Sequence, residues 1–207
     1  MRHVLIATSN PGKLRDFAAA AAPHHITIRA IPGFNTLPLA VEDGSSFEEN
    51  ARKKAIHYSH FVPSELVLAD DSGLEVDTLD GAPGVHSARY AALGPGPLPV
   101  AENSADAANN LRLLRELTGV PEERRGARFV AVIAAARDGQ ALATFRGSVE
   151  GRITHDQRGS SGFGYDPLFF VPELGRTFGE SSLDEKARLS HRGKAFRAFL
   201  EWARNQQ

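Results

Sequence analysis

The sequence predicts an α/β protein, because short apolar runs of strand length alternate with segments of helical character. The first such run, Val4–Ala7, leads through a polar loop into an alanine-rich helical segment. A second run, Glu65–Ala69, is bounded by Pro63 and ends at turn-forming residues, as a short buried strand does. Two extended runs, Arg128–Ala136 and Ala141–Val149, are joined by an Asp-Gly pair, which is a strong hairpin signal. We therefore expect an α/β sheet that the hairpin extends into a second lobe.

Length and composition limit the class of protein. At 207 residues the chain is long enough for one sizeable core, and we expect a single domain, residues 1–207, with two lobes. The formal net charge of -1 gives no broad cationic field for nucleic acid, so an anionic ligand must be met by local charges. The absence of cysteine excludes disulfides and thiolate metal sites. Because no apolar run has the length of a signal or a membrane span, we expect a cytoplasmic protein without a membrane partner.

The polar loop Thr8–Lys13 follows the first strand and precedes the first helix. It offers hydroxyls, an amide, backbone N–H groups and one lysine at a helix N-terminus, and such a loop can hold phosphate oxygens. It lacks the glycine spacing of a Walker A loop. An ordinary helix cap beside a solvated lysine explains the same residues.

Between Val4–Ala7 and Glu65–Ala69, the segment Ile26–Ile31 alternates as a strand does, and a loop that contains Glu42 and Asp43 follows it. The next helix opens at a capping box, Ser46-Phe47-Glu48-Glu49. On this helix Asn50 and Lys54 share one face, and Glu49 and Lys53 share another. Either pair can serve a site or lie in solvent.

The stretch Asp70-Asp71-Ser72-Gly73 directly follows the strand Glu65–Ala69. Ligands of open α/β sheets bind at the carboxyl ends of strands, so this is a candidate site. Two adjacent carboxylates repel each other unless a proton or a cation lies between them, and Mg²⁺ prefers oxygen ligands. The alternative is a plain turn, since Asp, Ser and Gly are all good turn formers.

The second half of the chain contains one more helix and a second dense polar loop. We expect a helix over about Ser104–Leu117 with Leu111, Leu114 and Leu117 on one apolar stripe, preceded by a mobile loop at Gly94–Pro99. In the polar loop, Phe163 lies between two glycines that would let the backbone approach a ligand and present one aromatic face to it. A β-turn with the ring folded inward is the alternative.

Two helices end the chain. A capping box at Ser182 opens a helix that carries Lys186. The break Ser190-His191-Arg192-Gly193 then exposes an imidazole and a guanidinium together, or is a solvated helix junction. The last helix has an apolar stripe that we expect to be buried, made of Phe196, Phe199, Leu200 and Ala203.

Taken together in this order, six polar segments resemble the inosine triphosphate pyrophosphatase (Ham1/RdgB-like) family over nearly the whole chain. The segments are Thr8-Ser9-Asn10-Pro11-Gly12-Lys13, Ser46-Phe47-Glu48-Glu49-Asn50-Ala51, Ala69-Asp70-Asp71-Ser72-Gly73-Leu74, Gly84-Val85-His86-Ser87-Ala88-Arg89-Tyr90, Gly162-Phe163-Gly164-Tyr165-Asp166-Pro167 and Ser190-His191-Arg192-Gly193. The resemblance implies an elongated ITPase-like fold, in which a central twisted mixed sheet is flanked by helices and a cleft separates two lobes. It also implies a homodimeric, Mg²⁺-dependent enzyme that clears ITP, dITP and XTP from the nucleotide pool, releasing the monophosphate and pyrophosphate.

The resemblance further implies a role for individual residues. Asp71 corresponds to the general base and metal ligand, and Glu42 to a second metal ligand, although Val41 stands where the family often has an acidic residue. Residues that correspond to the family's substrate-binding set are Thr8, Ser9, Asn10, Pro11, Gly12, Lys13, Lys54, Ser72, Phe163, Gly164, Tyr165, Asp166, Lys186, His191 and Arg192.

We expect the loop and the two lysines to act on the triphosphate. Lys13, Lys54 and the N–H groups of Ser9 to Gly12 would stabilise charge on the pyrophosphate leaving group. Two alternatives stay open. One is a Maf-like pyrophosphatase, which normally carries a Ser-Pro-Arg-Arg loop, and the other is a nucleotide-binding module without catalysis.

Overall fold

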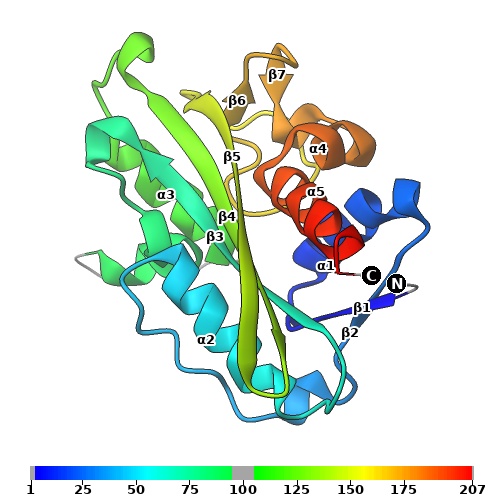
Figure 1. Ribbon diagram of the computed structural model, residues 1–207. Coiled ribbons are helices and arrows are strands. Elements are labelled where there is room, and N and C mark those ends of the chain that lie inside the picture. Colours follow the sequence, from blue (N-terminus) through cyan, green and yellow to red (C-terminus); the bar gives the residue numbers. More distant parts are fainter. Residues whose placement is uncertain (1–2, 95–104, 207) are drawn as a thin grey trace. The chain divides into compact units, whose positions relative to one another are not determined.

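Seven strands form one mixed sheet in the part of the chain that the structure describes, in the order β2-β1-β3-β4-β5-β6-β7 (Figure 1). The structure is a computed structural model, and it describes residues 3–94 and 105–206. The strands are β1 (His3–Ile6), β2 (Thr27–Ala30), β3 (Val67–Val76), β4 (Gly126–Arg137), β5 (Gln140–Ile153), β6 (Phe169–Val171) and β7 (Arg176–Thr177). The helices are α1 (Pro11–Ala21), α2 (Phe47–Ser59), α3 (Ala105–Glu116), α4 (Leu183–Leu189) and α5 (His191–Arg204), and short 3₁₀ segments include Gly84–Leu93. The predicted α/β class is confirmed.

The chain divides into two compact units. The first unit comprises Met1–Ser72, Val130–Ser148 and Leu183–Gln207, and the second comprises Gly73–Phe129 and Val149–Ser182. Strands β3, β4 and β5 each contain residues of both units. The expected single domain with two lobes stays a prediction.

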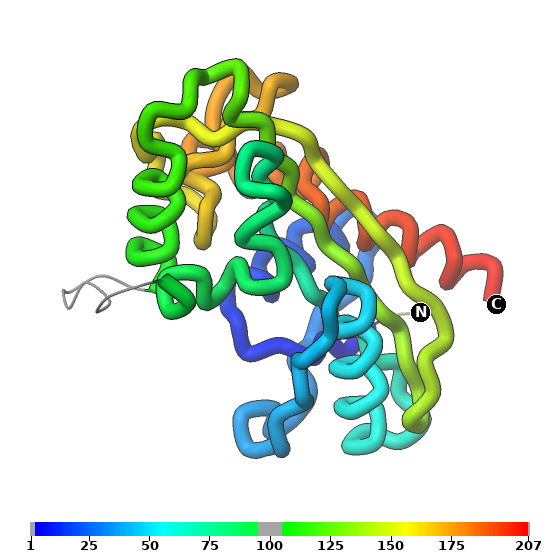
Figure 2. The backbone as a smooth tube through the Cα atoms, turned by 90° about the vertical axis from the view of Figure 1, so that its left-hand side faces the viewer, coloured from blue at the N-terminus to red at the C-terminus, as the bar shows by residue number. Residues whose placement is uncertain are grey.

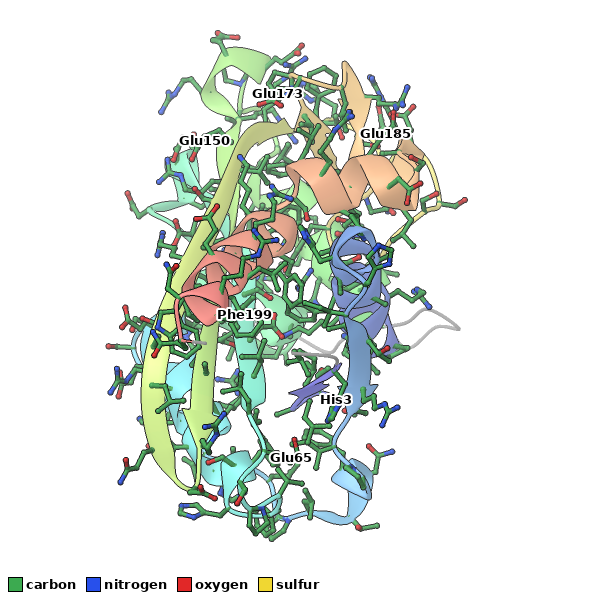
Figure 3. All side chains as sticks on the ribbon, turned by 45° about the vertical axis from the view of Figure 1, so that its right-hand side comes forward. His3, Glu65, Glu150, Glu173, Glu185 and Phe199 are labelled. Carbon is green, nitrogen blue, oxygen red and sulfur yellow. The ribbon has the colours of Figure 1, made fainter. Side chains whose placement is uncertain are left out.

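The core of the first unit is built on parallel pairing. β1 lies between β2 and β3 and runs parallel to both, with Leu5 opposite Val67 and Ile6 opposite Leu68. Because side chains alternate along a strand, every second residue of these strands faces α1 and α5. This face buries Phe17, Phe196 and Phe199, each with no exposed surface. Phe199 lies on α5 in Figure 3, and its ring centroid is 5.6 Å from that of Phe145 on β5. The predicted apolar stripe of the last helix is therefore confirmed.

Helix α2 lies beside the β4–β5 hairpin (Figure 2). At the hairpin tip, Asp138 and Gly139 have φ of 49° and 77°, the left-handed backbone that the Asp-Gly signal predicts. The N–H of Gly139 donates to Ser59 Oγ at the end of α2, at 2.9 Å. A Cβ at Gly139 would come within 2.1 Å of the His60 ring, so the close approach also requires glycine.

The second unit has its own core, which buries Leu113 of α3 and Leu117, directly after that helix. The prediction that Leu117 is on the apolar stripe is confirmed. The predicted stripe was wrong for Leu111, which is 38% exposed. The buried face instead begins with Asn109 and Asn110, each 3% exposed, because the asparagines find backbone partners that a sequence pattern does not reveal. The predicted loop Gly94–Pro99, beyond Gly94, and the helix start at Ser104 lie outside the described residues.

None of the helices within the described ranges has the length and hydropathy needed to cross a bilayer.

Candidate active site

The acidic pair lies within a strand and not after one. We expected a strand that ends at Ala69, but β3 continues to Val76, so Asp70 and Asp71 have extended backbone. The parallel pairing of β3 with β1 stops at Leu68, directly before the pair. Successive residues of a strand point to opposite faces, so the two carboxylates face different helices instead of sharing one cation. Both the expected strand end and the turn interpretation are therefore wrong.

Asp70 faces α1 and α5 and is 2% exposed. Its carboxylate lies 3.0 Å from Lys13 Nζ and 3.3 Å from Arg192 Nε, and it accepts a hydrogen bond from Ser72 Oγ at 3.1 Å. Burial by itself would raise the pKa of Asp70, but the charges of Lys13 and Arg192 outweigh it and hold that pKa well below its ordinary value. Asp70 is thus an ionised anchor for two cations.

Asp71 faces α2 and is 8% exposed. Lys54 Nζ donates to Asp71 Oδ1 at 3.0 Å, and the amide of Asn50 donates to Oδ2 at 3.2 Å. Burial raises the pKa of Asp71 above its ordinary value, and Lys54 opposes the rise only in part. The two adjacent carboxylates therefore differ in basicity, and Asp71 is the better proton acceptor.

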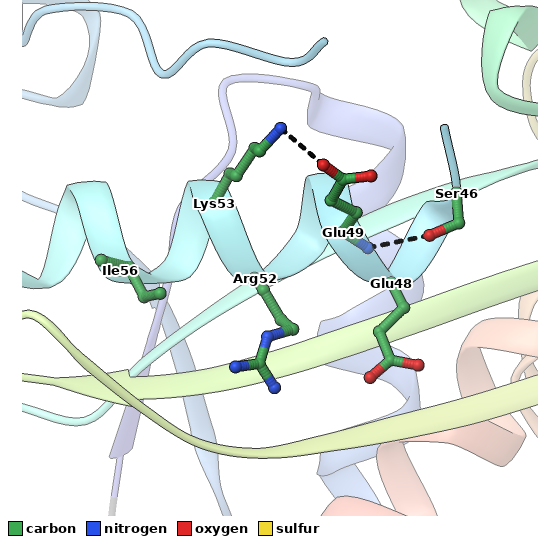
Figure 4. A pocket seen from close by; sticks show the side chains of 6 residues that line it. All are labelled: Ser46, Glu48, Glu49, Arg52, Lys53 and Ile56. Atoms are coloured by element: carbon green, nitrogen blue, oxygen red, sulfur yellow. Dashed lines mark hydrogen bonds and ion pairs between the residues drawn. The ribbon is translucent and has the colours of Figure 1, made fainter. Parts of the chain in front are cut away.

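The two faces of α2 have different roles. Lys54 and Asn50 are buried on the inner face against Asp71. Glu49 and Lys53 pair on the outer face at 2.8 Å, beside a pocket of about 460 Å³ that holds none of the predicted site residues (Figure 4). The predicted capping box is only half formed, because Ser46 Oγ accepts from the Glu49 N–H while the Glu49 side chain turns to the Ser45 N–H at 3.0 Å.

The loop between β1 and α1 binds its own backbone. The Asn10 side chain caps α1, which begins at Pro11, by accepting from the N–H groups of Gly12 at 2.8 Å and Lys13 at 3.1 Å. Thr8 Oγ1 accepts from the Asn10 N–H at 3.1 Å. We expected the N–H groups of Ser9 to Gly12 to meet phosphate, but Pro11 has no N–H. Of the other three residues, only Ser9 has an N–H group that makes no hydrogen bond in the described part of the chain. The Gly12 and Lys13 N–H groups are thus used within the loop itself. The role of this loop and of Lys13 in binding phosphate stays a prediction.

The junction between α4 and α5 brings two cations to a carboxylate that the sequence did not single out. Asp16 of α1, 6% exposed, accepts from Arg192 Nη1 at 2.9 Å and lies 3.3 Å from Lys186 Nζ. Arg192 Nη2 also donates to Ser72 Oγ at 2.7 Å, so its guanidinium is fixed by three partners. A signal existed, because Asp16 lies three residues after Lys13 and next to the buried Phe17, an unusual place for an acid.

His191 is buried beside these cations, with 2% of its surface exposed. Burial, followed by the charges of Arg192 and Lys186, holds the pKa of His191 well below its ordinary value. The imidazole is therefore neutral and has one donor and one acceptor nitrogen. The solvated-junction interpretation of this break is wrong.

The Phe163 loop belongs to the second unit. Gly162 and Gly164 have φ of 79° and 61°, a backbone conformation that favours glycine, and the Phe163 N–H donates to Asp166 Oδ2 at 2.9 Å. Tyr165 is buried and its hydroxyl donates to the Ser87 carbonyl at 2.9 Å. The Phe163 ring is half-buried, and the role of the four residues Phe163 to Asp166 in substrate binding stays a prediction.

The expected metal ligands can be tested against the donor geometry. Lys54 Nζ lies 2.9 Å from Glu42 Oε2 and 3.0 Å from Asp71 Oδ1, so the two carboxylates lie close together and share the Lys54 ammonium. No group of three or more His, Cys, Asp or Glu residues suited to a metal occurs within residues 3–94 and 105–206. Mg²⁺ often uses one or two carboxylates and completes its shell with water and substrate phosphate. Glu42 and Asp71 are thus two oxygen donors of the kind that a divalent cation uses.

Comparison with known proteins identifies the family of this chain. A model of the Ham1 family matches residues 4–202. The chain is 49% identical over 195 residues to the dITP/XTP pyrophosphatase of Acidobacterium capsulatum. The matched region covers 94% of this chain and 95% of that protein. Two solved structures, the Ham1 protein of Staphylococcus aureus and a HAM1 protein from Coxiella burnetii, each match with a TM-score of 0.80 and 35% identity. Each covers 99% of this chain and 100% of its own.

Proposed function

This chain belongs to the Ham1 family, and from that premise we propose that it hydrolyses the non-standard purine nucleoside triphosphates dITP, ITP and XTP to the nucleoside monophosphate and pyrophosphate. The name of its relative, dITP/XTP pyrophosphatase, supports this substrate class. The observation that carries the proposal is the pairing of two lysines with adjacent carboxylates of one strand, Lys13 with Asp70 and Lys54 with Asp71. This arrangement puts phosphate-binding cations beside a basic carboxylate.

Asp71 accepts the proton of the water that attacks the α-phosphorus. Its raised pKa makes it a stronger base than Asp70, although both are aspartates on one strand. Asn50 and Lys54 orient its two oxygens, so the carboxylate is held in place before substrate binds. Asp70 remains ionised and holds Lys13 and Arg192 in place.

Lys13 and Lys54 bind the triphosphate oxygens. Each ammonium lies about 3 Å from its carboxylate partner, and a phosphate oxygen can accept a further hydrogen bond, because an ammonium has three donors. These fixed cations stabilise the negative charge that develops on the departing pyrophosphate. Such electrostatic stabilisation is the largest contribution to catalysis in many phosphoryl transfers. When bound by Asp71 and Glu42, Mg²⁺ would supply neutralisation of phosphate charge and acidification of water.

Selection of the base is assigned to His191, Arg192 and Phe163. Inosine and xanthine carry an oxygen at purine C6 where adenine has an amino group, so N–H donors favour the former and leave adenine poorly paired. The neutral His191 and the fixed Arg192 supply such donors, and Lys186 shares Asp16 with Arg192. Phe163 supplies a face for stacking on any purine. We include in the proposal the homodimer that the family resemblance implies and the cytoplasmic location that we expected from the apolar runs of the sequence.

The test is a product assay with purified protein. We expect pyrophosphate from ITP, dITP and XTP, little or none from ATP, GTP and dTTP, and loss of activity when EDTA removes Mg²⁺. Orthophosphate as the direct product would reject the proposal. Asp71→Asn should lower kcat by at least about 100-fold while ITP still binds, because Lys13 and Lys54 remain. Asp43→Asn, which changes an exposed carboxylate near Glu42, is the matched control and should leave kcat unchanged. Binding of ITP without turnover by the wild-type protein would indicate a binding module instead.

A further inference from the structure

The buried face of α3 holds backbone of two other segments through a pair of neighbouring asparagines. Asn109 accepts from the Ala91 N–H at 2.8 Å and donates to the Ala88 carbonyl at 3.1 Å, so it grips the segment Gly84–Leu93. Asn110 donates from Nδ2 to the carbonyl of Gly164 at 3.0 Å. The two side chains have the same chemistry and the same 3% exposure, but they serve different loops.

Gly164 is bound by α3 on both sides of its backbone. Its N–H donates to Asp106 Oδ2 at 2.8 Å, and its carbonyl accepts from Asn110. Asp106 and Asn110 are four residues apart, so they lie one above the other on the same face of the helix. In the described part of the chain no other hydrogen bond holds the backbone of Gly164.

These two bonds add to those that Phe163 itself makes with Asp166, and they hold the glycine on its carboxyl side. Phe163 stands between Gly162 and Gly164, and glycine loses more conformational freedom on ordering than any other residue. On the carboxyl side the chain is secured by Tyr165, whose hydroxyl is bonded to Ser87, and by Asp166. A Cβ on Gly162 would come within 2.0 Å of Asp166 Oδ2, so the glycine cannot be replaced to stiffen the loop.

We propose that Asp106 and Asn110 are positioning residues of the substrate site, which hold the backbone of Gly164 so that the Phe163 ring is presented to the purine base. This inference rests on the proposed function, because it gives the ring a base to stack on. Asp106 and Asn110 do not touch substrate themselves. They act by fixing both sides of the Gly164 backbone, next to the aromatic residue, before substrate arrives, which lowers the ordering that binding must otherwise cause.

The experiment compares four variants of the full chain. Asn110→Leu and Asp106→Leu each remove one bond to Gly164. Asp106→Asn keeps an acceptor oxygen and serves as the conservative rescue. Asn109→Leu removes two bonds from an equally buried asparagine on the same helix but leaves Gly164 untouched, so it controls for loss of packing. Ser87, which anchors Tyr165, has its own bond from the Leu74 N–H at 2.9 Å and does not depend on Asn109.

Two readouts separate positioning from general destabilisation. In steady-state assays with ITP, Asn110→Leu and Asp106→Leu should raise KM about tenfold with kcat within about twofold, because base binding is lost equally in ground state and transition state. Asp106→Asn and Asn109→Leu should keep the KM of the wild-type protein. In amide hydrogen exchange, a peptide that contains Gly164 should exchange faster than in the wild-type protein in Asp106→Leu and Asn110→Leu. Its exchange should be unchanged in Asp106→Asn and Asn109→Leu.

Equal KM changes in the Asn109 and Asn110 variants would overturn the proposal, as would a fall in kcat at constant KM. If the Gly164 amide still exchanged slowly in Asn110→Leu, the proposal would also be overturned. This hydrogen-exchange measurement does not depend on enzymatic activity. If the wild-type protein releases no pyrophosphate from ITP, the proposed function itself fails. The positioning role then fails with it, even if hydrogen exchange shows that Asp106 and Asn110 hold Gly164.

Discussion

Replacing Asp16 by asparagine tests whether the buried charge network is as tightly coupled as its distances indicate. The change keeps the shape of the side chain and removes one negative charge. Arg192 and Lys186 lie 2.9 and 3.3 Å away, with side chains 5% and 4% exposed. Arg192 keeps Asp70 as a partner at 3.3 Å. The variant therefore leaves buried positive charge with less compensation.

The expected loss of stability follows from burial. Removing one partner of a buried pair costs about 3–5 kcal/mol, and the remaining Asp70 places this variant at the lower end, about 3 kcal/mol. For a chain of this length 1 kcal/mol corresponds to about 2–4 °C, so Tm should fall by about 6–12 °C. The control is Asp43→Asn, since Asp43 pairs with Lys53 at 2.7 Å but is 69% exposed. Exposed pairs contribute about 0–1 kcal/mol, so Tm should fall by less than about 4 °C.

Thermal unfolding followed by circular dichroism, at low and at high salt, measures both variants. Salt should weaken the small effect at Asp43 and leave the effect at Asp16, because buried pairs are poorly screened. If the two variants lost similar stability, or if high salt abolished the Asp16 effect, the claim that burial makes this network strong would be refuted.

Two further predictions concern stability. Because the pKa of His191 is held well below 6.5, the unfolded chain binds a proton below pH 6.5 that the folded chain refuses, so stability is complete above that pH and declines as pH falls. Between pH 7.5 and 5.5 this residue should lower the free energy of unfolding by an amount on the order of 1 kcal/mol, and His191→Gln should lose that share of the pH dependence in urea unfolding; an unchanged pH dependence would show that His191 has the same pKa in the folded and unfolded chain. Arg125 is 2% exposed and donates to the carbonyls of Leu117, Ile153 and Thr154 at 2.8–3.0 Å. In urea unfolding, Arg125→Met should therefore lower the free energy of unfolding by at least about 3 kcal/mol, since hydrogen bonds from charged donors contribute about 1.5–3 kcal/mol each. Arg125→Lys should lower it less. A loss below about 1 kcal/mol in Arg125→Met would mean that water takes the place of the arginine.

The acidic pair shows where sequence reasoning reached its limit. Asp70 and Asp71 were identified as the centre of the site, and cations do gather around them. Turn propensity nevertheless suggested that the strand ends before them, whereas it runs on to Val76. Local propensity counts only neighbours in sequence, but the cations that make buried aspartates tolerable in a strand come from α1, α2 and α5.

A similar limit applies to α3. Periodicity of apolar residues placed Leu111 inside, although it is 38% exposed, and gave no role to Asn110. The asparagine is buried because the backbone of Gly164, 54 positions further along the chain, supplies its acceptor. A pattern of hydrophobic residues contains no information about such a partner.

The amino-acid sequence by itself determined the α/β class, the elements that end in polar loops, and the family motifs on those loops, because these depend on periodicity and on short runs of residues. Only the tertiary structure decided that Asp70 and Asp71 face opposite sides of one strand, that Asp16 joins the network, and that Asn10 occupies the N–H groups expected to meet phosphate. The physical reason is that the pKa and the partners of a buried group are set by charges and donors that folding brings from distant parts of the chain.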